Sequence, residues 1–361
     1  MSPTRGIAPG KVAIAAHHYQ RPQIVARASL VGDSYRLAVE AARTDAEFIV
    51  LCGVRFMAES AAILAREGQT VLLPDMDAGC PMADMIDRGT AEDALAKIAK
   101  LAAKAAVPVV YMNSHADLKA LAGERGGSVC TSGNARKILA HYLDSGAPVF
   151  FTPDFNLGMN TARELGIAPG EIRRVGRNLA IARVDGDDGA EDRDDLSAAR
   201  LFLWDGFCHV HRAFTEDDVR KARDRFPDAK IIVHPECSPS VTALADGAGS
   251  TEAMRAWLAD AAPGSRWVVG TEGRFVERMA AELADRTILP LRASYCHNMN
   301  RIDLPSLERT LESIAEAGSL LGADGKAQKA LPGAVSVRAE EREAAAKALR
   351  AMVEITEATG K

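Results

Sequence analysis

Short apolar runs rich in Val and Ile alternate along the chain with Ala-rich stretches whose apolar residues recur at helical spacing. This alternation is typical of βαβ units with a parallel sheet. The pattern therefore predicts an α/β protein built from three βαβαβ modules. The candidate strands are, in three consecutive sets, Lys11–His17, Glu47–Cys52 and Thr70–Leu73; Pro108–Met112, Gly127–Thr131 and Pro148–Thr152; and Lys230–His234, Ser265–Gly270 and Arg286–Leu291.

Small polar clusters follow nearly every one of these predicted strands. They read AHHYQ, PDMDAGC, YMNSH, CTSGN, TPDFN, HPEC and GTEG. In open parallel α/β sheets, ligands bind beyond the carboxyl ends of the strands, where loops converge and helix N-termini present free N–H groups. If the three modules face inward, these clusters line one central site.

Two further segments depart from the modular pattern. The stretch Ala182–Arg200 is strongly acidic and nearly devoid of core-forming residues, which favours a solvated insertion over a docking loop. Toward the C-terminus the pattern is helical, with Leu307, Leu311 and Ile314 at core spacing. This tail is expected to pack across a neighbouring module or a second subunit.

Composition sets the class of protein and argues against several partners. At 361 residues, with 47% apolar and 26% charged residues, the chain matches a globular protein of two or three compact units. A net charge of −5 and the lack of a Lys/Arg stripe indicate no nucleic-acid partner. No apolar stretch approaches the roughly 20 residues that span a bilayer, and Val12–Ala16 is too short for a secretory signal. We therefore expect no membrane partner and a cytoplasmic location.

Six cysteines stand far apart in the sequence, without a close CxxC pair: Cys52, Cys80, Cys130, Cys208, Cys237 and Cys296. Such spacing argues against a disulfide framework. In a reducing compartment each is a buried small hydrophobe, a catalytic thiol or a metal ligand, and spacing alone does not choose among these. Taken singly, each cysteine is better explained by packing in the core than by a catalytic or metal-binding role.

Ten segments, taken together and in order, resemble quinolinate synthase. They are GVRFMAESA (Gly53–Ala61), VLLPDMDAGCPMADM (Val71–Met85), YMNSHADLKA (Tyr111–Ala120), TSGNA (Thr131–Ala135), PDFNLG (Pro153–Gly158), WDGFCHVH (Trp204–His211), HPEC (His234–Cys237), ADGAGST (Ala245–Thr251), GTEG (Gly270–Gly273) and CHNM (Cys296–Met299). The similarity runs from about His17 to Leu304. An ordered set of this kind is far more specific than any single motif.

The resemblance implies three similar αβα domains with short parallel sheets, arranged with pseudo-threefold symmetry around a central active site. Each domain lends one cysteine to a [4Fe–4S] cluster. The implied segments are 1–87 with Cys80, 88–211 with Cys208 and the acidic insertion at about 183–200, 212–300 with Cys296, and a C-terminal helical segment 301–361. Three thiolates leave one iron open, so the cluster is expected to act as a Lewis acid rather than as an electron carrier.

The cysteines outside this ligand set are Cys52, Cys130 and Cys237. Cys237 directly follows the HPE triplet, so it is placed either at the site or, in the favoured interpretation, in the core.

The reaction implied by the resemblance condenses iminoaspartate with dihydroxyacetone phosphate and releases phosphate and water, forming quinolinate for de novo NAD biosynthesis. An aspartate-oxidising enzyme is the expected supplier of the imine. Several proton transfers are needed, which requires groups that exchange protons near neutrality. The candidates in matched segments are Glu236, His234, His211, Tyr111 and Tyr19, with Glu236 and His234 favoured.

The substrates carry carboxylates and a phosphate, yet the matched segments are poor in Arg and Lys. Hydroxyls and free N–H groups at helix N-termini bind anions, and Asp33–Ser34, Thr131–Ser132 and Ser250–Thr251 each precede an Ala-rich stretch. The expected substrate-binding residues are His17, Ser34, Asn113, Ser132, His234, Glu236, Ser250 and Thr251. Plain N-caps are the structural alternative for the hydroxyls, and PDFNLG and GVRFMAE fit turns and helix starts equally well.

Two other functions are compatible with part of the sequence. A mononuclear metal hydrolase or lyase would use His209, His211, His234 and Glu236 on zinc or iron, but it leaves three cysteines in matched segments without a role. A non-catalytic α/β protein that binds a phosphorylated metabolite at its helix N-termini would need no cluster. Iron and sulfide in anaerobically purified protein would distinguish the last from the leading interpretation.

Overall fold

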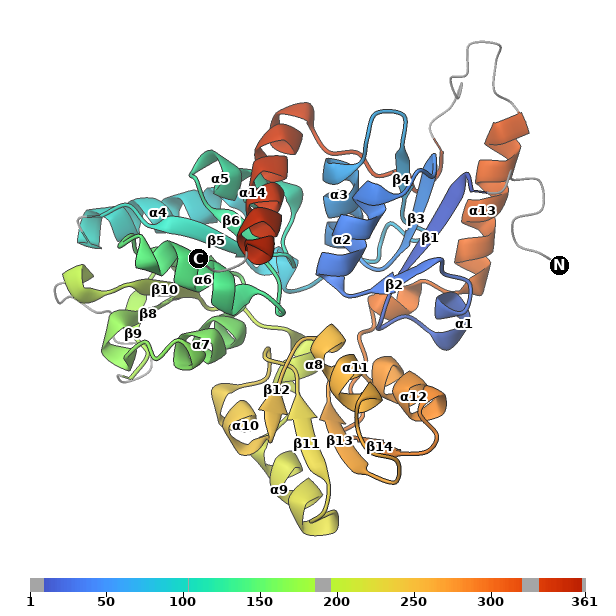
Figure 1. The fold of residues 1–361 in the computed structure, drawn as a ribbon. Coiled ribbons are helices and arrows are strands. Elements are labelled where there is room, and N and C mark those ends of the chain that lie inside the picture. The colour runs from blue at the N-terminus through green and yellow to red at the C-terminus, as the bar shows by residue number, and fades with distance from the viewer. Residues whose placement is uncertain (1–9, 103, 186–195, 320–330, 359–361) are drawn as a thin grey trace.

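The structure of this protein, a computed structural model, describes residues 10–102, 104–185, 196–319 and 331–358. The strands form three sheets, parallel throughout except for one antiparallel pair in the second sheet. The three lobes built on these sheets lie around a common centre (Figure 1). The predicted α/β class with three modules is confirmed. In the described ranges, no helix is long and apolar enough to cross a membrane.

The first lobe has the strand order β2-β1-β3-β4. Its elements are β1 (Val12–His17), α1 (Pro22–Val25), β2 (Leu30–Gly32), α2 (Ser34–Arg43), β3 (Phe48–Cys52), α3 (Arg55–Leu64) and β4 (Thr70–Leu72). The register pairs Ala16 with Cys52 and His17 with Gly32, so the carboxyl ends of the strands meet at one edge. The two central strands are buried along nearly their whole length, which is why they appear in the sequence as continuous apolar runs.

The second lobe has the strand order β6-β5-β7-β10-β8-β9. Its elements are α4 (Arg88–Ala102), β5 (Val107–Tyr111), α5 (Ala116–Glu124), β6 (Ser128–Cys130), α6 (Ala135–Asp144), β7 (Val149–Thr152), α7 (Phe155–Glu164), β8 (Ile172–Val175), β9 (Ile181–Arg183), β10 (Leu201–Trp204) and α8 (His209–Arg212). Its first four positions repeat the order of the first lobe, and the antiparallel β8–β9 pair extends the sheet.

The third lobe repeats the same order as β12-β11-β13-β14. Its elements are α9 (Glu216–Arg225), β11 (Lys230–Val233), α10 (Pro239–Leu244), β12 (Gly247–Ala248), α11 (Thr251–Ala259), β13 (Arg266–Gly270), α12 (Gly273–Glu282) and β14 (Thr287–Pro290). The start of α9 is a capping box, because Thr215 Oγ1 accepts from Asp218 N–H at 3.2 Å and the Asp218 carboxylate accepts from Thr215 N–H at 2.9 Å.

The nine predicted strands are all present, to within one residue at each end. The three-strand modules are nevertheless wrong, because each lobe has a fourth strand in the common order: β2, β10 and β12. Strands β2 and β12 have only three and two residues, too few to show a periodicity. Strand β10 directly follows the acidic stretch, whose composition predicts an insertion rather than part of a sheet.

The acidic insertion expected at about 183–200 needs a similar correction. Its central part, 186–195, lies outside the described residues. On the near side, β9 pairs with β8, and on the far side Leu196 and Ala199 are buried. Both flanks thus belong to the folded second lobe, because their apolar residues join its core.

The C-terminal tail packs across two lobes of the same chain (Figure 1). Helix α13 (Leu304–Ser319) contacts α1 and β3, whereas α14 (Ala339–Glu357) contacts α5, α6 and β6. Leu307, Leu311 and Ile314 are buried, as their spacing predicted. One large hydrophobic cluster runs through all three lobes and both C-terminal helices, so the domain boundaries at 87, 211 and 300 stay a prediction.

The contact between α5 and α14 depends on one glycine. A Cβ atom at Gly123 would lie 1.9 Å from the carbonyl oxygen of Ala344 in α14. We expect Gly123→Ala to lower the free energy of unfolding by about 1–3 kcal/mol, because the backbone of α14 must move away. Thermal or urea unfolding measures this. The matched control is Gly89→Ala in α4, where the Cβ meets only Asp87 Oδ1 at 3.5 Å; equal destabilisation of the two variants would contradict the prediction.

Candidate active site

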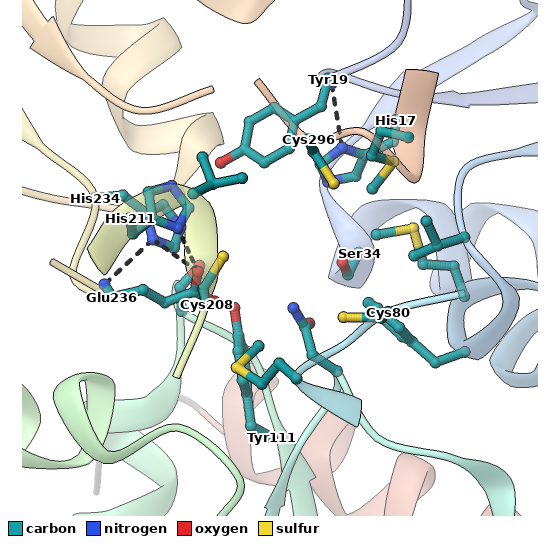
Figure 2. A pocket seen from close by; sticks show the side chains of 18 of the residues that line it. His17, Tyr19, Ser34, Cys80, Tyr111, Cys208, His211, His234, Glu236 and Cys296 are labelled. Atoms are coloured by element: carbon teal, nitrogen blue, oxygen red, sulfur yellow. Dashed lines mark hydrogen bonds and ion pairs between the residues drawn. The ribbon is translucent and has the colours of Figure 1, made fainter. Parts of the chain in front are cut away.

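One cavity opens where the carboxyl ends of the three sheets converge, with about 730 Å³ of empty space (Figure 2). It is lined by residues of all three lobes. Of the fourteen site residues predicted from the sequence, thirteen line it: His17, Tyr19, Ser34, Cys80, Tyr111, Asn113, Ser132, Cys208, His211, His234, Glu236, Thr251 and Cys296. The exception is Ser250, whose hydroxyl instead caps α11 by accepting from Ala253 N–H at 3.3 Å.

Three cysteines reach the cavity from equivalent places in the three lobes. Cys80 follows β4, Cys208 follows β10 and Cys296 follows β14, and each of these strands holds the fourth position of the common order. Their sulfur atoms point toward the centre of the cavity (Figure 2). Burial raises the pKa of all three thiols, to about 12 for Cys80 and about 11 for Cys296. Such thiols ionise only when a positive partner such as a metal displaces the proton.

The Glu236 carboxylate is the centre of a buried hydrogen-bond network. Tyr111 donates its hydroxyl proton to Oε1, and His211 Nδ1–H donates to Oε2, each at 2.5 Å. Burial would raise the pKa of Glu236, but His234, His211 and the hydrogen bonds from His211 and Tyr111 outweigh it and lower this pKa to about 2. The carboxylate is therefore an acceptor at both oxygens.

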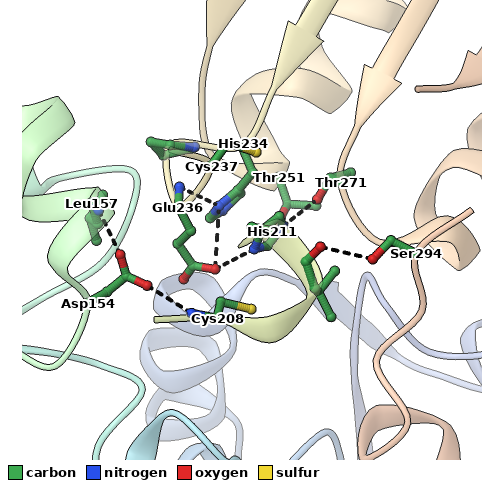
Figure 3. A network of polar contacts seen from close by, with 12 residues as sticks. Asp154, Leu157, Cys208, His211, His234, Glu236, Cys237, Thr251, Thr271 and Ser294 are labelled. Atoms are coloured by element: carbon green, nitrogen blue, oxygen red, sulfur yellow. Dashed lines mark hydrogen bonds and ion pairs between the residues drawn. The ribbon is translucent and has the colours of Figure 1, made fainter. Parts of the chain in front are cut away.

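A chain of hydrogen bonds extends from Glu236 through His211 to Thr271 (Figure 3). With His211 donating from Nδ1 and accepting at Nε2, the Thr271 hydroxyl at 3.0 Å is the donor to Nε2. Thr271 in turn accepts from the Tyr19 hydroxyl at 2.8 Å, and Tyr19 accepts from Thr251 at 3.2 Å. The donors form one chain, Thr251 to Tyr19 to Thr271 to His211, that ends on Glu236.

Two further histidines stand against this chain. The His234 ring stacks on the His211 ring at 4.2 Å between centroids, and burial lowers its pKa to about 3. His17 lies edge-on to Tyr19, its Nδ1 accepts from Tyr19 N–H at 3.2 Å, and burial holds its pKa well below the ordinary value. Burial thus favours the neutral form of both rings.

Hydroxyls at helix starts form a further part of the lining. Ser34 begins α2 and Thr251 begins α11, while their predecessors Asp33 and Ser250 supply the N-caps. Asn113 also lines the cavity, and its buried side-chain oxygen has no hydrogen-bond partner among the described residues. None of the described lining residues is Lys or Arg. Anions here would be held by neutral donors.

Each junction between lobes is crossed by a buried polar side chain near the cavity. The Lys119 ammonium donates to Phe56 O, Ser60 Oγ and Ser114 O, which joins the first and second lobes. Asn160 Nδ2 donates to Pro235 O and Cys237 O on either side of Glu236, which joins the second and third. Gln20 Nε2 donates to Met299 O, which joins the first lobe to the segment after Cys296.

Sequence reasoning missed Thr271 as a site residue. It lies in the matched GTEG segment, but nothing in the sequence shows that its hydroxyl meets side chains of two other segments. The remaining cysteines lie in the core, which is the interpretation that the sequence favours. Cys52, Cys130 and Cys237 are fully buried and do not line the cavity.

The model of the family described as quinolinate synthetase A protein matches residues 7–354. The chain belongs to the quinolinate synthase family. The quinolinate synthase of Streptomyces coelicolor is 43% identical over 313 residues, which are 85% of this chain and 78% of the relative. That of Listeria monocytogenes is 43% identical over 304 residues, or 83% and 81%. That of Haloarcula marismortui is 38% identical over 348 residues, or 95% and 87%.

Membership in the quinolinate synthase family confirms the resemblance and the assignment as an enzyme of NAD biosynthesis. It overturns the two rival interpretations. The mononuclear hydrolase also fails on geometry, because the ligand atoms within 4.8 Å of one another belong to Cys208, His211 and Glu236 rather than to the predicted histidine set, which included the exposed His209.

In this quinolinate synthase family member, Thr271→Val should lower the rate of quinolinate formation about tenfold. Valine keeps the shape but leaves His211 and Tyr19 without their shared partner, and an unsatisfied buried polar group costs about 1–3 kcal/mol. Steady-state kinetics measure the effect. Thr271→Ser keeps the hydroxyl and should retain most of the activity; a serine variant as slow as the valine variant would show that the methyl group, not the hydroxyl, matters.

Proposed function

We propose that this protein condenses iminoaspartate with dihydroxyacetone phosphate to quinolinate, releasing phosphate and water, with a [4Fe–4S] cluster held by Cys80, Cys208 and Cys296. The observation that carries the proposal is the convergence of three cysteines, one from each lobe, on a cavity that also holds the Glu236 network.

The cysteine geometry supports a cluster over a single ion. The three sulfur atoms face one cavity, yet they do not form a group whose atoms all lie within 4.8 Å of one another, as ligands of one ion would. Ligands of three different irons stand farther apart. When bound, the cluster supplies an iron without a protein ligand, which acts as a Lewis acid.

Substrate anions are proposed to bind at the helix starts. The phosphate and carboxylates would accept hydrogen bonds from Ser34, Ser132 and Thr251 and from the N-terminal N–H groups of α2 and α11. Asn113 lines the cavity, and its side-chain oxygen, which has no hydrogen-bond partner among the described residues, can accept a hydrogen bond from a substrate amine or hydroxyl.

Proton transfers are proposed to pass through the groups around Glu236. His211 holds a proton against Glu236 Oε2 and can pass it to substrate as Nε2 takes one from the Thr271 hydroxyl, so the ring stays neutral. Burial and Glu236 raise the pKa of Tyr111 well above its ordinary value, so Tyr111 keeps its proton and orients the carboxylate. The chain through Thr271, Tyr19 and Thr251 can return a proton to His211. His234 and His17 would act as neutral donors or acceptors rather than as cations. In this proposal His211 carries the first proton, and Glu236 and His234, the residues favoured from the sequence, stay candidates for the other transfers.

The partners are proposed on chemical grounds. Iminoaspartate hydrolyses readily, so its supplier must be an enzyme that oxidises the amine of aspartate close in time and space.

Replacing each proposed ligand tests the cofactor. Cys80→Ser, Cys208→Ser and Cys296→Ser should each abolish cluster assembly and quinolinate formation, because three sites are needed to hold the cluster. Iron and sulfide analysis of anaerobically reconstituted protein measures assembly. Cys52→Ala and Cys130→Ala are the controls, since both thiols are buried away from the cavity. A full complement of iron in any of the three serine variants would redraw the ligand set.

Glu236→Gln tests the proton-transfer network separately from the cofactor. The amide nitrogen cannot accept, so either Tyr111 or His211 loses its partner, and turnover should fall about 100-fold or more. The iron and sulfide content should match the parent protein. Parental turnover in this variant would place the proton chemistry elsewhere.

A further inference from the structure

Asp154 joins a helix start to one of the cysteine loops. It follows β7 and caps α7, where its Oδ1 accepts from Leu157 N–H at 2.7 Å. Its Oδ2 accepts from the backbone N–H of Cys208 at 3.2 Å (Figure 3). The side chain is completely buried, at 0% exposure.

Glu272 makes the same connection in the third lobe. It follows β13 and caps α12, where its Oε2 accepts from Arg274 N–H at 2.7 Å. Its Oε1 accepts from the backbone N–H of Cys296 at 3.1 Å. This side chain is also completely buried.

The two positions are equivalent in the common strand order. In each lobe the helix after the third-position strand begins beside the loop that follows the neighbouring fourth-position strand. The first lobe makes the link without a carboxylate: Val54 stands at the N-cap of α3, and Arg55 N–H donates to Ala78 O at 2.8 Å, two residues before Cys80. Asn298 then holds the same loop from the third lobe by donating to Gly79 O at 2.9 Å.

Helix capping alone does not explain two buried carboxylates. Ser238 and Ser250 cap α10 and α11 with a hydroxyl, and a neutral cap suffices there. A buried carboxylate is costly, and neither Asp154 nor Glu272 forms an ion pair with another described residue. What a carboxylate adds is a second acceptor, and in both lobes that acceptor is used on a cysteine.

We propose that Asp154 and Glu272 are positioning residues that fix the backbone of Cys208 and Cys296 so that both sulfur atoms face the cavity and retain the metal cluster. The inference rests on the ligand set of the proposed function. It assigns the PDFNLG and GTEG segments a role that helix-start chemistry alone would not require.

The amide variants Asp154→Asn and Glu272→Gln test this. Each keeps an oxygen for the helix N–H but presents an NH₂ group to the cysteine N–H, so two donors oppose each other. Iron release to a ferrous chelator from anaerobically reconstituted protein should be about tenfold faster than in the parent, at the lower end of the 10–100-fold effects seen for groups that orient metal ligands. Melting temperatures of the metal-free proteins report folding separately.

Two further variants sharpen the comparison. Asp154→Ser keeps a good N-cap but is too short to reach Cys208, so it should fold like the parent and still release iron faster. Asp303→Asn is the matched control, because Asp303 accepts from Ser306 N–H at the start of α13 at 2.9 Å and has no hydrogen bond to a cysteine; its iron release should equal that of the parent.

The outcomes separate the two proposals. A parent protein that binds no iron and sulfide when reconstituted overturns the proposed cofactor itself. A parent that holds the cluster, with folded Asp154→Ser and Glu272→Gln variants that release iron at the parental rate, overturns only the positioning role. Equally fast release from Asp303→Asn would also overturn it, because the effect would then belong to any altered helix cap.

Discussion

The three buried side chains at the lobe junctions hold the rest of the structure in place. Lys119, Asn160 and Gln20 each cross from one lobe to backbone or side-chain acceptors of another. A buried polar group without a hydrogen-bond partner destabilises the fold by its desolvation free energy. A shift of one lobe against another would break these hydrogen bonds and is therefore unfavourable. Parallel strands present their carboxyl ends at one edge of a sheet. With the lobes held in place, the three edges together line one cavity.

The described lining of the cavity contains hydroxyl, imidazole, thiol and carboxylate groups but no fixed cation. Hydroxyls and free N–H groups at helix starts supply the donors, and the described lining holds neither Lys nor Arg. The Glu236 carboxylate accepts a hydrogen bond at each oxygen, from Tyr111 and from His211, since a carboxylate can only accept. The negative charge of bound anions would then be balanced by the group that binds between the three cysteines. The buried carboxylates Asp154 and Glu272 accept hydrogen bonds from the backbone N–H groups of Cys208 and Cys296.

Much of the fold could be predicted because buried parallel strands produce continuous Val- and Ile-rich runs, and β1, β3 and β13 are of this kind. Most of the cavity lining could be predicted because its residues stand at the carboxyl ends of such strands: His17 and Tyr111 are the last residues of β1 and β5, and His234 directly follows β11. The strands β2 and β12 could not be predicted, since they have only three and two residues, too few to show a pattern. Ser250 was misplaced for a related reason: a helix start contains both a cap and a first helical residue, and only the backbone decides which of the two faces the cavity.

By itself the sequence determined the class of fold, the order of the polar segments and the family, because these depend on local periodicity and on residues near one another in the chain. Only the tertiary structure decided how distant segments meet. Thr271 became part of the site because Tyr19 and His211, 252 and 60 residues away along the chain, both reach its hydroxyl. Asp154 contacts Cys208 because the strands that precede them, β7 and β10, are neighbours in the sheet although β8 and β9 lie between them in the sequence. Such contacts depend on strand order and lobe docking, which no local pattern encodes.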